Sequence, residues 1–147
     1  MERLTLALIA HDTRKEDMVS LIKAHREELS EINLVATKKT GEMIQFRIGL
    51  PVMLLESGLH GGDQQIGALV ANGDVSAVIF LRDPIMAQPH EPKIADLLLV
   101  CDMHAIPLAT NMAAGEAVIH LLLDHPEALS GHHIAAQYLE EMAAVRE

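Results

Sequence analysis

The sequence predicts an α/β fold, in which a parallel β-sheet is covered by helices on both faces. Short apolar segments alternate along the chain with segments of helical periodicity, each of roughly ten residues. The first of these segments, residues 4–10, lacks the polar–apolar alternation of a half-exposed strand, so we expect it to be buried on both faces. Strands that alternate with helices form βαβ units, whose strands run parallel. With 147 residues, half of them hydrophobic, the chain can bury one core, and we expect a single domain over residues 1–147.

Five short apolar segments are predicted as strands. The first carries a single hydroxyl among apolar residues, and the fourth, Ala-Val-Ile-Phe-Leu, is the plainest strand in the sequence. The turn Asp83-Pro84 ends that fourth strand. In order, the predicted strands are residues 4–10, 32–36, 51–55, 77–81 and 107–109.

Six segments between and after these strands are predicted as helices. Gly49 ends the second helix, and Pro51 prevents it from resuming. Gly73 ends the third helix, and Pro92 lies near the start of the fourth. The last helix is predicted in the C-terminal tail. In order, the predicted helices are residues 16–29, 40–47, 63–70, 91–104, 113–123 and 131–147.

The composition excludes several classes of function. The chain has 11 Lys and Arg against 21 Asp and Glu, and its net charge of −10 disfavours a nucleic-acid-binding surface. Its aromatic residues, Phe46, Phe80 and Tyr138, are too few to form the stacking platforms of a single-strand binder. The single cysteine, Cys101, excludes an internal disulfide and suits the reducing cytoplasm, where we expect the protein. No apolar segment approaches the roughly 20 residues that span a bilayer, and no signal-peptide pattern precedes the first strand, so no membrane partner is expected.

Most side chains suited to acid–base or anion-binding chemistry fall in the loops that follow the predicted strands. The carboxyl ends of parallel strands meet at one edge of the sheet, and ligands of open α/β sheets bind there. The turns at the opposite edge, such as Asn72-Gly73-Asp74, are ordinary polar turns. The sequence therefore predicts one site assembled from several loops, with the candidates His11, Asp12, Lys15, Thr37, Lys38, Lys39, Thr40, Ser57, Gly58, Asp63, Asp83 and His90.

Two of these loops have the composition of anion-binding cradles. Thr37 and Thr40 lie where a helix begins, and the free backbone N–H groups at a helix N-terminus attract anions. Ser57-Gly58 leads through further glycines into another helix, and glycine lets the backbone approach a phosphate closely. Helix capping is the usual role of either loop alone. Because both loops occur with Lys15 at one edge, we favour a phosphate-binding site. The predicted substrate- or phosphate-binding residues are His11, Lys15, Thr37, Lys38, Lys39, Thr40, Ser57 and Gly58.

Three aspartates and two histidines at the same edge favour acid–base chemistry on a phosphorylated substrate. An aspartate at a helix start, such as Asp63, is most often a cap, and Asp83 before a proline is most often part of a turn. His90 lies between Pro89 and Pro92, and this stiff segment suits a histidine that points at a substrate.

A metal site is not expected from the sequence. The adjacent side chains of His11 and Asp12 diverge at a strand end, and no His-x-x-x-His pair lies on a helix near the site. The pair His132-His133 in the tail is no stronger a candidate. We predict neither a metal nor an organic cofactor.

Taken in order, these residues match the pattern of one known family. The match runs from about residue 4 to residue 123 and so covers most of the chain; its most specific parts are the Gly-Gly-Asp-Gln-Gln and Asp-Pro…Pro-His blocks. The chain resembles the methylglyoxal synthases in the blocks Ala10-His11-Asp12 with Lys15, Thr37-x-x-Thr40-Gly41, Ser57-Gly58-x-x-Gly61-Gly62-Asp63-Gln64-Gln65, Asp83-Pro84 with Pro89-His90-x-Pro92, and Ala109-Thr110-Asn111.

The resemblance implies a Rossmann-like three-layer α/β/α fold around a five-stranded parallel sheet, assembled as a homohexamer. It implies a lyase that converts dihydroxyacetone phosphate into methylglyoxal and inorganic phosphate without a metal or cofactor. In that family the aspartate matching Asp63 removes a carbon-bound proton, and the histidine matching His90 polarises the carbonyl and serves the enediolate. The aspartates matching Asp12 and Asp83 hold this network, and the phosphate is held by the positions matching Lys15, Thr37, Thr40, Ser57 and Gly58.

The chain departs from the family pattern at three lysines. Lys38 and Lys39 replace a glycine and a threonine of the phosphate loop, and Lys93 stands where an aspartate usually follows Pro-His-x-Pro. These lysines favour an alternative function, a non-catalytic phosphate- or nucleotide-binding regulatory domain of the same fold. Isomerisation of a sugar phosphate by the same acid–base pair is a further alternative. Because Asp63 and His90 are both present, the lyase is the favoured prediction.

Overall fold

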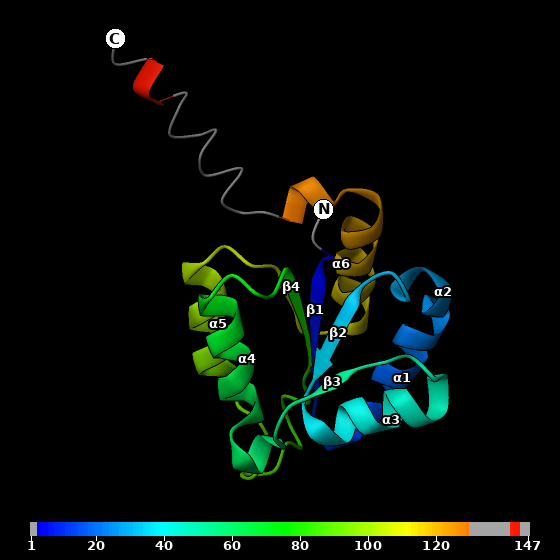
Figure 1. Ribbon diagram of the computed structural model, residues 1–147. Helices are drawn as coiled ribbons and strands as arrows, with labels where there is room; N and C mark the ends of the chain where they lie inside the picture. Colours follow the sequence, from blue (N-terminus) through cyan, green and yellow to red (C-terminus); the bar gives the residue numbers. More distant parts are fainter. Residues whose placement is uncertain (1–2, 130–141, 145–147) are drawn as a thin grey trace.

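The computed structural model describes residues 3–129 and 142–144, and a five-stranded sheet lies at its centre (Figure 1). All four strand pairings are parallel, and the strand order is β3-β2-β1-β4-β5. The predicted parallel sheet is therefore confirmed. The strands are β1 (Thr5–Ala10), β2 (Asn33–Ala36), β3 (Met53–Leu54), β4 (Ala77–Leu81) and β5 (Leu108–Ala109).

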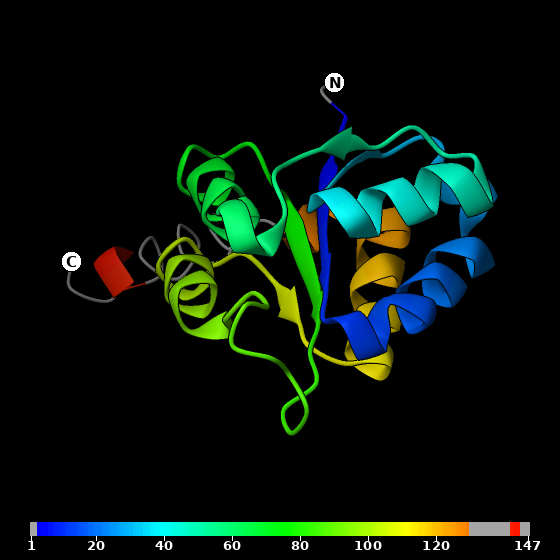
Figure 2. The same cartoon turned by 90° about the horizontal axis from the view of Figure 1, so that it is seen from below.

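Helices cover both faces of the sheet, as predicted, and give three layers (Figures 1 and 2). One face is covered by α1 (Lys15–Ala24), α2 (Arg26–Leu29), α3 (Lys38–Ile48) and α6 (Met112–Asp124). The other face is covered by α4 (Gly62–Ala71) and α5 (Ile94–Met103). Short 3-10 helices occupy Asp12–Arg14, Gly58–His60 and Pro126–Leu129.

The strands β1 and β4 contribute side chains to two hydrophobic cores, one on each face of the sheet. Side chains of β1 alternate between the faces, so that Leu6 and Leu8 pack under α1, α3 and α6, whereas Ala7 and Ile9 pack under α4 and α5. All of β4 is buried as well. Burial on both faces explains why these segments are apolar without alternation. In the described part of the chain, no helix is long and apolar enough to cross a membrane.

Two of the predicted helices differ from the structure by more than two residues or by a break. The helix predicted over residues 16–29 is divided at His25, whose φ of −119° and ψ of 25° leave the helical region. The helix predicted from residue 91 begins instead at Ile94, because Glu91 belongs to the preceding loop and accepts hydrogen bonds there. The helix predicted over residues 131–147 lies outside the described residues except for 142–144, which are helical.

Candidate active site

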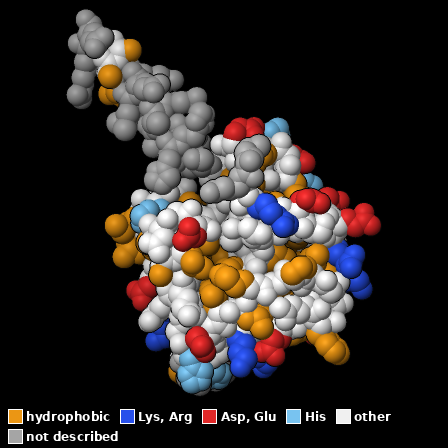
Figure 3. All heavy atoms as spheres, viewed as in Figure 1, with side chains coloured by type: hydrophobic (Ala, Val, Ile, Leu, Met, Phe, Trp, Pro, Cys, Tyr) orange, Lys and Arg blue, Asp and Glu red, His pale blue; other side chains and the backbone are white. Residues whose placement is uncertain are grey.

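A hollow of about 240 Å³ opens at the carboxyl edge of the sheet. The chain runs from β1 outward to β2 and β3, then returns to β4 on the other side of β1, so β1 and β4 flank a topological switch point. Charged and histidine side chains gather along the lower rim in Figure 3, below the carboxyl ends of the strands. The hollow is lined by Ala10, Asp12, Lys15, Thr37, Lys39, Ser57, Gly58, His90, Glu91 and Pro92.

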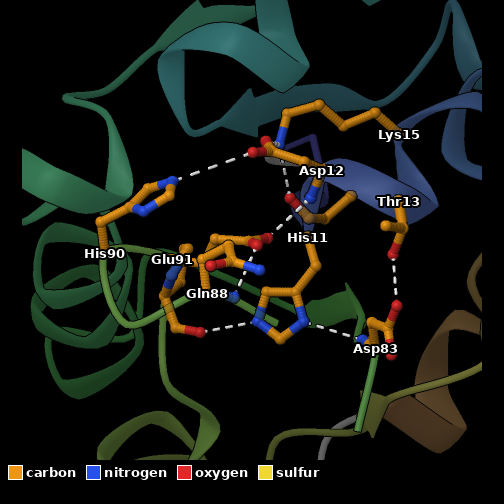
Figure 4. A network of polar contacts seen from close by, with 10 residues as sticks. His11, Asp12, Thr13, Lys15, Asp83, Gln88, His90 and Glu91 are labelled. Atoms are coloured by element: carbon orange, nitrogen blue, oxygen red, sulfur yellow. Dashed lines mark hydrogen bonds and ion pairs between the residues drawn. The ribbon is translucent and has the colours of Figure 1, made fainter. Parts of the chain in front are cut away.

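Asp12 links a lysine and a histidine at this hollow (Figure 4). Its Oδ1 accepts a hydrogen bond of 3.0 Å from Lys15 Nζ, and its Oδ2 lies 4.0 Å from His90 Nε2. The hydrogen bond from Lys15 is the largest influence on Asp12 and lowers the pKa of its carboxyl, outweighing burial, which raises it. Lys15 Nζ also donates to the Ala10 carbonyl at 2.7 Å. The ammonium group is therefore fixed at the hollow, where it can attract an anion.

His11 is buried beneath the loops of the site and does not line the hollow. It is 5% exposed, and its Nδ1 accepts a hydrogen bond of 2.8 Å from the backbone N–H of Asp83. Its Nε2 lies 2.7 Å from the Pro92 carbonyl, which can only accept, so Nε2 carries the proton. The ring thus ties the end of β1 to the loop after β4. His11 is predicted among the substrate- or phosphate-binding residues, but in the structure backbone groups engage both of its ring nitrogens and it does not line the hollow.

Asp83 orders the loop after β4 and also lies outside the hollow. Its Oδ1 accepts from the backbone N–H groups of Ile85 and Met86, and its Oδ2 accepts from the Thr13 hydroxyl at 2.6 Å. These bonds, that from Met86 foremost, lower the pKa of Asp83 to about 2. Its backbone N–H holds His11, so Asp83 acts on the site by positioning.

Stability should depend on pH through Asp83. A carboxyl whose pKa is lower in the folded chain stabilises it above the unfolded pKa, and this stability is lost as the pH falls toward the folded pKa. We therefore expect unfolding measured in urea to become easier between pH 3.8 and about 2, and the Asp83→Asn variant to show a flatter dependence there. The control is Asp74→Asn, at an exposed aspartate whose carboxylate accepts no hydrogen bond from the described residues. An Asp83→Asn variant with the wild-type slope would contradict the assignment.

Glu91 is a site residue that the sequence reasoning missed. It is 8% exposed, and its two oxygens accept hydrogen bonds of 2.8 Å from the backbone N–H groups of Asp12 and Gln88 (Figure 4). Burial is the largest influence and raises the pKa of Glu91, but these hydrogen bonds together lower it below its usual value. A carboxylate between His90 and Pro92 was the available signal, since a buried carboxylate is rare in proteins unless it has partners.

The phosphate-binding candidates divide between the hollow and its surroundings. Thr37, Lys39, Ser57 and Gly58 line the hollow beside the N-terminus of α3. Lys38 is exposed and is not among its lining residues. Gly58 is required there, because a Cβ at this position would lie 2.5 Å from Cγ of Pro92. The buried Thr40 in the first turn of α3 has a hydroxyl without a hydrogen-bond partner among the described residues.

Asp63 lies in the first turn of α4 and lines a separate crevice between α4 and α5, which Asp96 also lines. The expectation that Asp63 and His90 face one hollow is therefore not met in this structure, and Asp12 is the carboxylate beside His90. In the described part of the chain, the Asp63 carboxylate accepts no hydrogen bond and forms no ion pair. The loop that leads into α4 through Ser57 and Gly58 does line the hollow, and Gly62, which precedes Asp63, lies against Thr37 of the hollow.

Asp12, His90 and Glu91 bring ligand atoms within 4.8 Å of one another and are the residues of this site that could hold a metal ion. The chemistry of this donor set suits a metal poorly. Both oxygens of Glu91 are engaged by backbone N–H groups, and the Lys15 ammonium already neutralises Asp12. The arrangement instead offers a fixed cation, a helix N-terminus and an aspartate–histidine pair around a small hollow, which suits acid–base chemistry on a small phosphorylated anion.

A larger hollow of about 640 Å³ lies beside β2 and the edge strand β3, and its charged lining residues are Arg3 and Asp74. The Arg3 guanidinium already donates to the carbonyls of Ser30 and Glu31. The smaller hollow is therefore identified as the candidate site by its lysine, aspartate and histidine side chains, and not by its volume.

Three comparisons with known proteins point to the same family. Residues 17–110 match the family model described as MGS-like domain. The chain is 50% identical over 123 residues to a methylglyoxal synthase of Moorella thermoacetica, covering 84% of this chain and 96% of the relative. It is 52% identical over 116 residues to a methylglyoxal synthase of Bacillus licheniformis, covering 79% of this chain and 85% of the relative. The crystal structure of methylglyoxal synthase from Elizabethkingia anophelis superposes with a TM-score of 0.77 at 37% identity, covering 80% of this chain and 77% of that one. The chain belongs to the methylglyoxal synthase family.

Proposed function

We propose that this chain is a methylglyoxal synthase, a lyase that converts dihydroxyacetone phosphate into methylglyoxal and inorganic phosphate. The observation that carries the proposal is the small hollow, in which Lys15, Lys39 and residues beside the α3 N-terminus lie together with the Asp12–His90 pair. This combination supports binding of a phosphate ester next to a proton-transferring pair. Membership of the family supports the choice of reaction among those that such a site could perform.

The phosphate group of the substrate would be bound by the Lys15 and Lys39 ammonium groups and by the hydroxyls of Thr37 and Ser57. The N-terminus of α3 adds free backbone N–H groups, which carry partial positive charge. Because Gly58 has no side chain, the phosphate could approach the backbone closely at this part of the hollow. Thr40 is buried in the first turn of α3, and its hydroxyl has no hydrogen-bond partner among the described residues. It would support the phosphate-binding loop from its buried side.

For the proton chemistry we propose Asp63 as the base and His90 as the donor to the carbonyl oxygen. Asp12 is less suited to be the base, since its two oxygens face Lys15 and His90 and its pKa is lowered. Its negative charge lies beside the His90 imidazole and pairs with the Lys15 ammonium group. The Asp63 carboxylate has no such partner among the described residues, and it follows Gly62, which lies against Thr37 of the hollow. Asp83 positions the network through His11.

The reaction then proceeds by proton abstraction beside a carbonyl. The base removes a proton from the hydroxymethyl carbon, and His90 stabilises the charge that develops on the carbonyl oxygen. The resulting enediolate expels phosphate from the neighbouring carbon, so the carbon–oxygen bond to the phosphate breaks. The enol that remains gains a proton on carbon and becomes methylglyoxal. One substrate gives one methylglyoxal and one phosphate.

The test is incubation of the purified chain with dihydroxyacetone phosphate, followed by assays of methylglyoxal and inorganic phosphate. Equal amounts of the two products are expected. Binding of inorganic phosphate, measured by calorimetry, without turnover would instead indicate a non-catalytic regulatory domain. Formation of glyceraldehyde 3-phosphate, detected by NMR, would indicate an isomerase.

The adjacent lysines provide a matched pair for the phosphate site. Lys39 lines the hollow and Lys38 does not. Loss of one charge-assisted hydrogen bond costs roughly 1.5–3 kcal/mol, so Lys39→Ala should raise KM about 10- to 100-fold. Lys38→Ala should leave KM within about twofold, since its ammonium group is in solvent. Equal effects of the two substitutions in steady-state kinetics would contradict the assignment.

We also propose that the protein works as a homohexamer in the cytoplasm, as family membership suggests. Exposed apolar side chains on α5, those of Leu98, Leu99 and Met103, support burial of this helix against another copy. The buried free thiol of Cys101 is compatible with a reducing compartment. Light scattering during size-exclusion chromatography would measure the number of copies.

A further inference from the structure

Two histidines and a glutamate converge where α1 ends against α6, on the helical face formed by α1, α2, α3 and α6. His25 Nε2 lies 2.7 Å from Glu116 Oε1, and His120 Nε2 lies 3.3 Å from the same oxygen. The two imidazole rings are 5.5 Å apart at an interplanar angle of 85°. The proposed chemistry at the carboxyl edge of the sheet uses none of these three side chains.

The local structure explains why His25, Glu116 and His120 lie close together. Glu116 and His120 are four residues apart on α6, so they lie on one face of the helix. His25 ends α1, where its departure from helical φ and ψ turns the chain. Gly115 lets α6 approach α1, because a Cβ at this position would lie 2.9 Å from Cδ2 of Leu21. The close contact of the two helices thus brings His25 to the Glu116–His120 face.

We propose that His25, Glu116 and His120 bind a divalent transition-metal ion, with Zn²⁺ as the best fit. Their ligand atoms all lie within 4.8 Å of one another. Tetrahedral ligands at Zn–N and Zn–O distances of roughly 2.0–2.2 Å are themselves separated by about 3.3–3.5 Å, so small rotations of these side chains accommodate the ion. Two imidazoles and one carboxylate are a donor set typical of zinc with one position open to water. The exposed side of His120 gives solvent access to that position.

The second ring nitrogen of each histidine also faces a carboxylate. His25 Nδ1 lies 3.4 Å from Glu28 Oε2, and His120 Nδ1 lies 3.6 Å from Asp124 Oδ2. A metal-binding histidine usually donates its other N–H to such a carboxylate, which fixes the ring and strengthens the ligand. Glu28 and Asp124 thus support the site without being ligands themselves. Together with Glu116 they place three carboxylates around two imidazoles, and a divalent cation would neutralise this surplus of negative charge.

The proposed metal site is separate from the candidate active site. Lys15 begins α1 at the hollow and His25 follows its last residue, and a helix of ten residues is about 15 Å long. The ion would therefore act as a structural link between the end of α1 and α6. The proposal differs from the expectation that the chain binds no metal, and Glu116-x-x-x-His120 is the sequence pattern that points to it.

The proposal is tested by calorimetric titration of the full chain, stripped of metal by a chelator, with ZnCl₂. One Zn²⁺ should bind per chain with micromolar affinity or better. His120→Gln, at a position that is 58% exposed and so tolerant of substitution, should weaken binding more than about 100-fold. Asp124→Asn should weaken it about tenfold, because it alters only the support of a ligand. Co²⁺ titration gives a second readout, since the visible absorption bands of low-coordinate Co²⁺ should be lost in His120→Gln.

Two control variants separate this site from the other histidines. His125→Gln, just past the end of α6, and the double variant His132→Gln/His133→Gln in the tail should both bind one Zn²⁺ with wild-type affinity. Circular dichroism should show an unchanged helical signal in every variant. Wild-type affinity in His120→Gln, loss of binding in the tail variant, or the absence of a bound ion at millimolar ZnCl₂ would each overturn the proposal.

Discussion

Asp63→Asn is expected to lower kcat/KM for dihydroxyacetone phosphate by roughly 10²- to 10⁴-fold, the usual contribution of general acid–base catalysis. Asparagine has nearly the same shape as aspartate but cannot accept the proton. Because the carboxylate forms no hydrogen bond or ion pair with the described residues, the substitution should leave the fold intact. Steady-state kinetics with a methylglyoxal assay measure the effect. Exchange of the substrate's carbon-bound protons with D₂O, followed by NMR, should be lost in parallel.

The control for this prediction is Asp74→Asn, at the opposite edge of the sheet, which should retain full activity. Asp12→Asn is the informative comparison, since Asp12 is the aspartate that lies beside His90. If Asp12 only holds Lys15 and His90, its substitution should change the pH profile of kcat while proton exchange remains detectable. Full proton exchange in Asp63→Asn, with none in Asp12→Asn, would transfer the role of base to Asp12.

Gly62→Ala is expected to destabilise the chain by about 3 kcal/mol or more, at the upper end of the effects of overpacking. A Cβ at Gly62 would lie 1.9 Å from the carbonyl oxygen of Glu56 and 2.9 Å from Cγ2 of Thr37. The first clash involves backbone, which cannot rotate away, so the loop that lines the hollow must shift. Activity should therefore fall together with the melting temperature.

Gly67→Ala is the matched control in the same helix. Its Cβ would meet Cγ1 of Val100 at 3.7 Å, an ordinary contact. Alanine is the better helix former, so this variant should be more stable by about 0.5–1 kcal/mol. Thermal unfolding of both variants measures the two effects. A Gly62→Ala variant as stable as Gly67→Ala would show that the backbone at Glu56 yields without cost.

Much of the fold could be predicted because its signals are local. Apolar segments without alternation marked β1 and β4, and glycine marked the end of α3, where Gly49 has a φ of 83°. The alternation of strands and helices then fixed the parallel pairing, and with it the edge at which polar loops gather. The candidates Asp12, Lys15, Thr37 and His90 were found at one hollow for this reason.

The parts that could not be predicted depend on contacts between residues far apart in the sequence. His11 bonds to Pro92, 81 residues away, and so became a buried brace where a phosphate ligand was expected. Glu91 became a site residue through the backbone of Asp12, 79 residues away. His25 ends α1 and meets Glu116, 91 residues along the chain, which no periodicity reveals. The side-chain direction of Asp63 was equally undetermined, because the packing of α4 against α5 decides which crevice it faces.

The sequence alone thus determined the fold class, the edge of the sheet that carries the chemistry and the residue types gathered there, since these follow from periodicity and from the rules of chain connection. Only the tertiary structure decided which of those side chains face the hollow, which support it from behind and which form a second cluster at the end of α1. The physical reason is that hydrogen bonds and charges act over a few ångströms in space, whatever the separation along the chain.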